Sequence, residues 1–363
     1  MIPASPQTLP VPARRPIDQL TGIRGLAAGI VFISHAANLG WLPIVFGEGW
    51  GKIGVMMFFM LSGFLMGYLY LHRPPSRAMV GRYVRSRLAR VLPLYLLLVV
   101  ASFLLYGGLR AGWMYAVDDL PTFGMAAAML RAPGILWTIP VEVQFYAVFV
   151  GAWLLWHRCR RVWLLLAYAA LSMIPMVVVA WVTRQIPLLF STYCHTFFIG
   201  ILLALASDRL RGSGAWRRAA SWAAVPLLVL LVINLPEWRR GAGLIVHPYF
   251  KLRVWFDPPT LLIVGGLLTC AVMEVRPLRF LASRPMRWMG DISYGFYLLH
   301  FPVILLVDQL RLPGVVSLLI AAVLSIALAS LSLRFFERPA DKLIRGPRQI
   351  RTVVPKPETG VPG

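Results

Sequence analysis

Residues 20–39 read LTGIRGLAAGIVFISHAANL, a run of twenty residues whose only ionisable side chains are Arg24 and His35. An α-helix rises about 1.5 Å per residue, so twenty residues extend over about 30 Å, roughly the thickness of the hydrocarbon core of a bilayer. The stretch is therefore predicted to be a transmembrane helix that carries two groups which are costly to place in lipid.

Similar apolar runs recur along the whole chain of 363 residues, which is 59% hydrophobic and 14% charged, with a mean hydropathy of +0.72. This apolar content exceeds that of an ordinary water-soluble domain. The sequence predicts an all-α fold, a polytopic bundle of about ten transmembrane helices. The predicted spans cover residues 20–39, 53–71, 91–108, 138–156, 162–182, 188–206, 219–235, 259–275, 292–310 and 314–334.

The net charge of +22 does not indicate a nucleic-acid partner, because the basic residues lie between apolar runs rather than on one face. Of the 36 Lys and Arg residues, 26 fall in alternate connections beginning with the N-terminal segment, nine fall in the other connections, and Arg24 lies within a span. The positive-inside rule then places both termini in the cytoplasm. We expect a flexible cytoplasmic tail at 1–16, a transmembrane domain of ten helices at 17–345 and a disordered cytoplasmic tail at 346–363.

The three cysteines, Cys159, Cys194 and Cys270, show no paired spacing. Disulfide frameworks and zinc sites need such pairs, so we assign these cysteines packing roles and expect no metal. Two longer outer connections, near 109–137 and 236–258, are interpreted either as a lid over an outward-facing site or as plain connectors.

Arg24 and His35 are eleven residues apart in the first span. At about 100° per residue, eleven residues return the helix to within about 20° of its starting direction, so the two side chains share a face about 16 Å apart. Ionisable groups inside spans are functional hypotheses by default. The alternative is that Arg24 extends to the lipid headgroups and His35 binds a neighbouring carbonyl group.

Glu142 lies near the outer start of the fourth span, at the depth expected for His35. A carboxylate there would orient an imidazole and stabilise its protonated form, although Glu142 alone would equally serve as a helix cap. The fifth span contains no comparable group. His300 lies in the middle of the ninth span, where a lone histidine is usually a hydrogen-bonded core residue.

A basic run precedes the third span and is interpreted as a cytoplasmic loop. Its arginines either hold the phosphates of a nucleotide cofactor through charge-assisted hydrogen bonds or only set the topology. The run contains Arg82, Arg85, Arg87 and Arg90.

Five strings together resemble the acyltransferase-3 family of bacterial integral membrane O-acyltransferases, and the resemblance covers nearly the whole chain. The strings are Ile17-Asp-Gln-Leu-Thr-Gly-Ile-Arg24 with His35, Gly54 to Phe64 with Ser62-Gly63, the arginine run ending Pro93-Leu-Tyr95, Val141-Glu142-Val-Gln144-Phe-Tyr146, and Ser293-Tyr294 through His300. The chain departs from the family pattern at Met56, Pro140 and Val143, where Asp, Ser and a second Glu are common, and these changes leave the Arg–His pair intact.

The resemblance implies acyl-CoA, with acetyl-CoA foremost, as donor, and a hydroxyl of a sugar, glycan or macrolide-like metabolite as acceptor. It implies His35 as base and Glu142 as supporting carboxylate. The implied donor-binding residues are Arg24, Ser62, Arg82, Arg85, Arg87, Arg90 and Tyr95. The implied substrate-binding residues are Gln144, Tyr146 and His300. The expected location is the bacterial cytoplasmic (inner) membrane, and the length of the chain favours a small acceptor.

These expectations combine into a threading hypothesis, in which the nucleotide of acyl-CoA stays at the cytoplasmic side and its long pantetheine arm brings the thioester to His35. The competing function is a transporter or flippase that uses Arg24, His35 and Glu142 as a proton relay or as a substrate-binding site. A membrane sensor or scaffold would leave those three groups without a purpose.

Overall fold

The computed structural model describes residues 15–47, 49–183, 189–236, 239 and 254–346. The predicted tails at 1–16 and 346–363 lie almost entirely outside the described residues, as does most of the second outer connection near 236–258. Throughout the described ranges the regular structure is helical, which confirms the predicted all-α bundle.

Nine helical stretches in the described ranges are long and apolar enough to cross a bilayer, and the pair α11 and η5, bent by 83°, makes a tenth when counted as one span. Each predicted span overlaps one of them. The spans contain α1 (Asp18–Asn38), α2 (Trp50–Tyr70), α3 (Arg77–Ser102) with the π-helix η2 (Phe103–Gly108), α5 (Thr138–Cys159), α6 (Val162–Thr183), α7 (Phe190–Gly212), α8 (Gly214–Ile233), α11 (Pro258–Val272) with η5 (Arg276–Ala282), α12 (Arg284–Asp308) and α13 (Gly314–Ser332).

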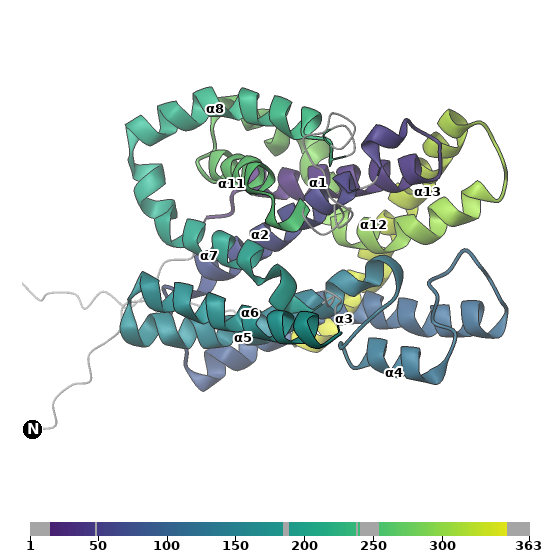
Figure 1. Ribbon diagram of the computed structural model, residues 1–363, viewed down its shortest axis with the longest axis horizontal. Helices are drawn as coiled ribbons and strands as arrows, with labels where there is room; N and C mark the ends of the chain where they lie inside the picture. Colours follow the sequence, from purple (N-terminus) through teal and green to yellow (C-terminus); the bar gives the residue numbers. More distant parts are fainter. Residues whose placement is uncertain (1–14, 48, 184–188, 237–238, 240–253, 347–363) are drawn as a thin grey trace, which may run out of the picture.

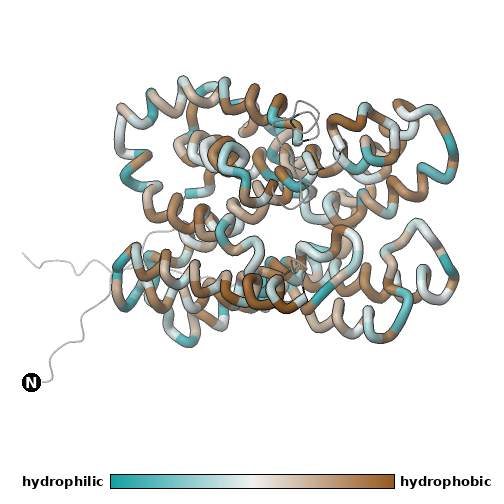
Figure 2. Tube along the Cα trace, in the orientation of Figure 1, coloured by the Kyte–Doolittle hydropathy of each residue, from teal (hydrophilic) through white to brown (hydrophobic). Residues whose placement is uncertain are grey.

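Shorter helices connect or extend these spans. They are η1 (Ile44–Phe46), α4 (Leu120–Ala127), η3 (Gly134–Trp137), η4 (Val254–Phe256), the π-helix η6 (Leu333–Glu337) and α14 (Arg338–Arg345). In Figure 1 the long helices run mostly across the view, with the α7–α8 turn at the left end and α4 and the α12–α13 turn at the right. Hydrophilic segments are concentrated toward these two ends in Figure 2, as expected for a protein whose apolar middle lies in lipid.

Helix α1 is the central element of the bundle because it packs against both α2 and α12, while α2 packs in turn against α7. Two glycines allow these close approaches. A Cβ added at Gly63 would collide with the carbonyl oxygen of Phe197 on α7, and one added at Gly290 would collide with that of Thr21 on α1. Small residues at such crossings let helix backbones approach closely in membranes.

The basic run that was interpreted as a loop is helical, and that prediction was wrong. Helix α3 begins at Arg77, capped by the Ser76 Oγ, which accepts a hydrogen bond from the Met79 N–H at 3.2 Å. Arginine is a good helix former, so nothing in the run opposes extending the helix beyond the membrane. The consequence is that the arginines of the run point in different directions around one helix.

The connection at 109–137 folds back onto the end of the bundle that contains His35. The Tyr115 hydroxyl donates to the Leu298 carbonyl oxygen on α12 at 2.6 Å, and the Tyr297 hydroxyl donates to that of Ile135 at 3.3 Å. The Tyr95 hydroxyl of α3 donates to the Ala126 carbonyl oxygen of α4 at 2.9 Å. Side chains of α3 and α12 therefore hold this connection against the end of the bundle that contains His35.

Candidate active site

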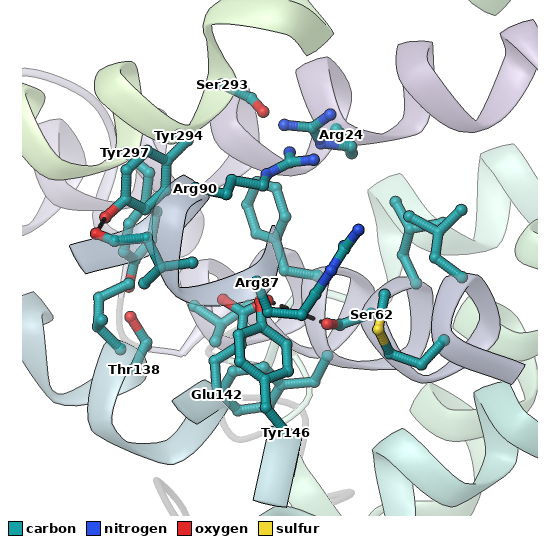
Figure 3. A pocket seen from close by; sticks show the side chains of 18 residues that line it. Arg24, Ser62, Arg87, Arg90, Thr138, Glu142, Tyr146, Ser293, Tyr294 and Tyr297 are labelled. Atoms are coloured by element: carbon teal, nitrogen blue, oxygen red, sulfur yellow. Dashed lines mark hydrogen bonds between the residues drawn. The ribbon is translucent and has the colours of Figure 1, made fainter. Parts of the chain in front are cut away.

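A cavity of about 730 Å³ lies between α1, α2, α3, α5 and α12. Apolar residues of α2 form much of its wall, and polar groups converge on it from the other helices, as is typical of ligand pockets. Figure 3 shows the Arg24 and Arg90 side chains next to each other at one edge of the cavity and Glu142 with its partners at the other. The charged and hydroxyl side chains that line it are Arg24, Ser62, Arg87, Arg90, Thr138, Glu142, Tyr146, Ser293, Tyr294 and Tyr297.

Three arginines line this cavity without forming an ion pair with any carboxylate in the described ranges: Arg24 from α1, and Arg87 and Arg90 from α3. The Arg87 Nε is buried and has no hydrogen-bond partner. All three arginines are partly buried, and a partly buried cation without a close carboxylate favours the binding of an anion. Three guanidinium groups that line one cavity can together bind an anion such as a phosphate group.

The other two arginines of the run, Arg82 and Arg85, are exposed and do not line the cavity. At about 100° per residue, the midpoint of this pair lies about 140° around α3 from the midpoint of Arg87 and Arg90, so the two pairs occupy different faces of the helix. The structure therefore divides the four predicted donor-binding arginines into an inward-facing pair and an outward-facing pair.

Glu142 lines the cavity that contains the arginines and does not contact His35. Its Oε1 accepts hydrogen bonds from the Ser62 hydroxyl at 3.0 Å and from the Tyr146 hydroxyl at 2.7 Å, and it lines the same cavity as Arg24. The structure gives Glu142 no contact with His35. The sequence placed the two residues at one depth, but the position of α5 relative to α1 is a tertiary property that depth alone does not determine.

A second cavity, of about 710 Å³, adjoins the first and shares Arg24, Arg90 and Tyr294 with it. Its other polar residues come from the last span and the helix after it: Glu337, Arg338, Asp341 and Arg345, with Asp291 of α12. Arg345 also donates to the Ser86 carbonyl oxygen of α3 at 3.3 Å, so α14 packs beside the opening. Together the two cavities make a polar passage from α14 past Arg24 into the bundle.

Glu337 is a site residue that the sequence reasoning missed. It sits in the π-helix η6, where its Oε1 accepts a hydrogen bond from the Ser332 hydroxyl at 2.9 Å and approaches the backbone of α12 at Gly295. The sequence signal was a single acid directly after an apolar run and among basic residues. The basic residues that surround Glu337 otherwise indicate only a cytoplasmic end of the chain.

His35 lies at the other end of α1, among aromatic rings. Its ring centroid is 5.4 Å from that of His300 and 5.1 Å from that of Phe301, both on α12. Phe301 in turn stacks on Tyr115 of the 109–137 connection at 6.0 Å. Arg24 and His35 therefore both face α12, Arg24 beside Tyr294 in the cavities and His35 beside His300.

The cavity containing the arginines does not have His35 in its wall. Tyr297 stands between them, because it lines the cavity and its ring is 5.9 Å from that of His300, which in turn contacts His35. Phe58 packs on Tyr297 at 5.9 Å and lines the same wall. A ligand that extends from the arginines to His35 must displace these rings.

Two of the predicted site residues have partners elsewhere. Tyr95 is fully buried and bonded to α4, and the Gln144 side chain links the Met129 carbonyl oxygen (3.1 Å) to the Phe190 N–H (3.0 Å). Both of these side chains lie outside the cavity walls described above, whereas Ser62 and Tyr146 line the first cavity.

Over the described ranges no three His, Cys, Asp or Glu side chains are grouped as metal ligands.

Comparison with known proteins gives a match to the acyltransferase domain family, acyltransferase 3, over residues 17–334. The chain is similar to peptidoglycan O-acetyltransferase OatA of Listeria monocytogenes (25% identity over 91% of this chain and 56% of the relative) and to acyltransferase MdmB of Streptomyces mycarofaciens (26% over 79% of each). It is also similar to O-acetyltransferase OatA of Staphylococcus aureus (24% over 90% of this chain and 58% of the relative).

The chain thus spans little more than half the length of the OatA proteins. No solved structure matches it. The family match nevertheless covers most of the chain, including all the residues that line the first cavity. This chain, a multi-pass membrane protein, belongs to the acyltransferase-3 family.

Proposed function

We propose that this protein is a membrane O-acyltransferase that moves an acyl group, acetyl foremost, from acyl-CoA to a hydroxyl of a sugar, a glycan or a glycosylated metabolite. The observation that carries the proposal is that Arg24, Arg87 and Arg90 line one cavity of the helix bundle and form no ion pair with a carboxylate of the described residues. The nucleotide end of CoA carries several phosphate charges, and arginine binds phosphate in bidentate geometry.

The donor enters beside α14, in this proposal, and its phosphates bind the three arginines. The opening at α14 carries Arg338 and Arg345, and the two cavities meet at Arg24 and Arg90. The basic residues of the alternate connections place this end of the bundle in the cytoplasm, where acyl-CoA is made, and both termini with it. Ser62, Glu142 and Tyr146 shape the cavity wall around the donor.

The pantetheine arm then extends along α1 toward His35, a distance of about 16 Å for eleven helical residues. Displacement of the Tyr297 and Phe58 rings brings the thioester to His35. There His35 accepts the proton of the acceptor hydroxyl as the oxygen attacks the thioester carbonyl carbon. The C–S bond breaks, the ester forms, and the thiolate of CoA takes the proton from His35.

Names of the relatives support a carbohydrate acceptor, because one is a peptidoglycan O-acetyltransferase. A hydroxyl-bearing acceptor reaches the His35 end from the side covered by the 109–137 connection, which we place on the outer face. In this proposal the protein is located in the bacterial cytoplasmic membrane.

The experiment that tests the function is a thiol-release assay on the purified protein in nanodiscs with acetyl-CoA, with and without muropeptides or simple sugars. We expect release of CoA thiol that depends on an acceptor, and a mass increase of one acetyl group on that acceptor. A protein that neither binds nor consumes the thioester but moves an amphiphilic substrate across vesicles would instead be a transporter. The His35→Ala variant is the matched negative control.

A further inference from the structure

His300 is a buried histidine that faces the proposed base. It is 1% exposed, and its ring is 5.4 Å from that of His35 with an angle of 43° between the ring planes. Aromatic rings surround it on the other sides, with Phe296 stacked on it at 5.8 Å and Phe32 at 6.1 Å. The surroundings of His300 are therefore dry, apart from His35 itself.

The hydrogen bonding of His300 determines which nitrogen carries the proton. Its Nδ1 lies 3.1 Å from the Phe296 carbonyl oxygen, one helical turn earlier on α12. A carbonyl oxygen can only accept, so Nδ1 donates and Nε2 of the neutral ring is left with its lone pair. That Nε2 is buried and has no hydrogen-bond partner. An acceptor left unpaired in the interior costs free energy, which indicates that a donor reaches it in another state.

The carboxylates of this region are not free to serve His35. Glu142 is bonded to Ser62 and Tyr146, and Asp308 accepts a hydrogen bond from the Trp41 Nε1 at 3.0 Å. His35 itself makes no hydrogen bond to the described residues, so neither of its nitrogens has a fixed role in this state. Four rings pack on His300, and of these only His35 and Tyr297 carry a polar hydrogen. The Tyr297 hydroxyl already donates to the Ile135 carbonyl oxygen, so among these neighbours His35 is the donor available to the unpaired His300 Nε2.

We infer that His300 is a positioning residue for His35. The Nε2 of His300 accepts a hydrogen bond from one N–H of His35, while the other ring nitrogen of His35 acts as the base. The inference rests on the function proposed above. Catalytic hydrogen bonds are often long before substrate binds and tighten in the loaded complex, so a small rotation of the His35 ring on ligand binding forms this bond. When His35 takes the proton of the acceptor hydroxyl, the resulting imidazolium keeps its bond to His300, and the proton later passes to the CoA thiolate.

Three variants of His300 separate positioning from packing. The His300→Gln side chain places a carbonyl oxygen near the position of Nε2, His300→Asn is too short to reach His35, and His300→Phe keeps only the ring shape. We expect the Asn and Phe variants to lose about 10–100-fold in kcat, the range for one hydrogen bond to a charged group. The KM for acetyl-CoA should stay unchanged in both, and the Gln variant should recover at least a third of the wild-type kcat.

Wild-type turnover by His300→Phe, or equal losses in the Gln and Asn variants, would overturn the inference. Retention of CoA binding and of a single size-exclusion peak shows that a variant is folded. If the Phe variant does not fold, the Gln and Asn pair alone decides. If His35→Ala is inactive but all His300 variants are fully active, only the inference about His300 is contradicted. If the wild-type protein consumes no thioester, the proposed function itself is contradicted.

A second measurement does not depend on activity. Solid-state NMR of ¹⁵N-histidine protein in nanodiscs, with the His300→Gln spectrum subtracted, reports the tautomer of His300. We expect the resonances of a neutral ring protonated at Nδ1, and a change at Nε2 when a non-hydrolysable acyl-CoA analogue is added. A ring protonated at Nε2 alone would contradict the assignment.

Discussion

The two ends of α1 present different environments to the same ligand. At the inner end, Arg24 joins two polar cavities and has two other cations, Arg87 and Arg90, beside it. At the outer end, His35 lies among Phe301, His300 and the ring of Tyr115 beyond them. Charge supplies affinity for a polyanion, whereas the aromatic rings around the partly exposed His35 limit its contact with water. In the proposed function, donor binding and proton transfer therefore take place at separate ends of one helix.

The largest expected effect is on chemistry at the outer end. His35→Ala removes the proposed base, so acetyl transfer should fall by about 10²–10⁴-fold, the usual contribution of a general base. Acetyl-CoA binding should be unchanged, because the phosphate site is about 16 Å away along the helix. Stopped-flow thiol release and equilibrium binding on the same preparation check both. Retained acetyl transfer would show that His35 is not the base and that the two ends of α1 do not have the separate roles proposed.

The arginines of α3 provide a matched pair for the inner end. Arg90→Gln removes a cation from the cavity, so the Kd for CoA should rise by about 10–100-fold, the range for one or two hydrogen bonds to a charged group. Arg82→Gln on the exposed side of the same helix removes an equal charge and should leave the Kd within about twofold. Equal losses in the two variants would show that α3 sets only topology and overall charge.

The Gly290→Ala variant tests whether the close contact between α12 and α1 stabilises the protein. Gly290→Ala places a methyl group against the Thr21 carbonyl oxygen and should destabilise the protein by about 1–3 kcal/mol, as overpacking does. Gly81→Ala, which meets no neighbour and lies in helix α3, should be neutral or stabilise by up to about 1 kcal/mol. Thermal unfolding in detergent compares them. An unchanged midpoint for Gly290→Ala would mean that α1 and α12 are not held together there.

The smallest effect is expected at Glu142. Both its hydrogen bonds go to Oε1, so Glu142→Gln can keep them through its carbonyl oxygen and lose only the negative charge. With less repulsion of phosphate, the Kd for CoA should fall by about two- to fivefold, a modest change for one screened charge. The kcat should stay within about threefold. A collapse of kcat with normal CoA binding would instead place Glu142 in the chemistry of His35.

The spans and the Arg24–His35 arrangement were predictable because they depend on local properties, namely hydropathy over twenty residues and the helical period. The partners of Glu142 were not, since its hydrogen bond to Ser62 depends on how α5 and α2 are placed relative to each other. The division of the arginine run into Arg87 and Arg90 inward and Arg82 and Arg85 outward followed once the run was helical, and misinterpreting it as a loop concealed that pattern.

Other parts of the site come from tertiary packing that no local signal encodes. Tyr297 lies between the cavity and His300, in a helix that packs closely on α1 at Gly290. Tyr115 reaches Leu298 because the 109–137 connection folds back over the bundle. Glu337 faces Arg24 and Arg90 across the second cavity because the last span changes to a π-helix where it meets α12.

The measurement that tests the central claim most directly is an electron cryomicroscopy structure with bound CoA. The account predicts that the phosphates lie within hydrogen-bond distance of Arg24, Arg87 and Arg90, and that the pantetheine arm passes displaced Tyr297 and Phe58 rings to bring its sulfur to His35. CoA bound outside this cavity, or with its sulfur directed away from His35, would contradict it.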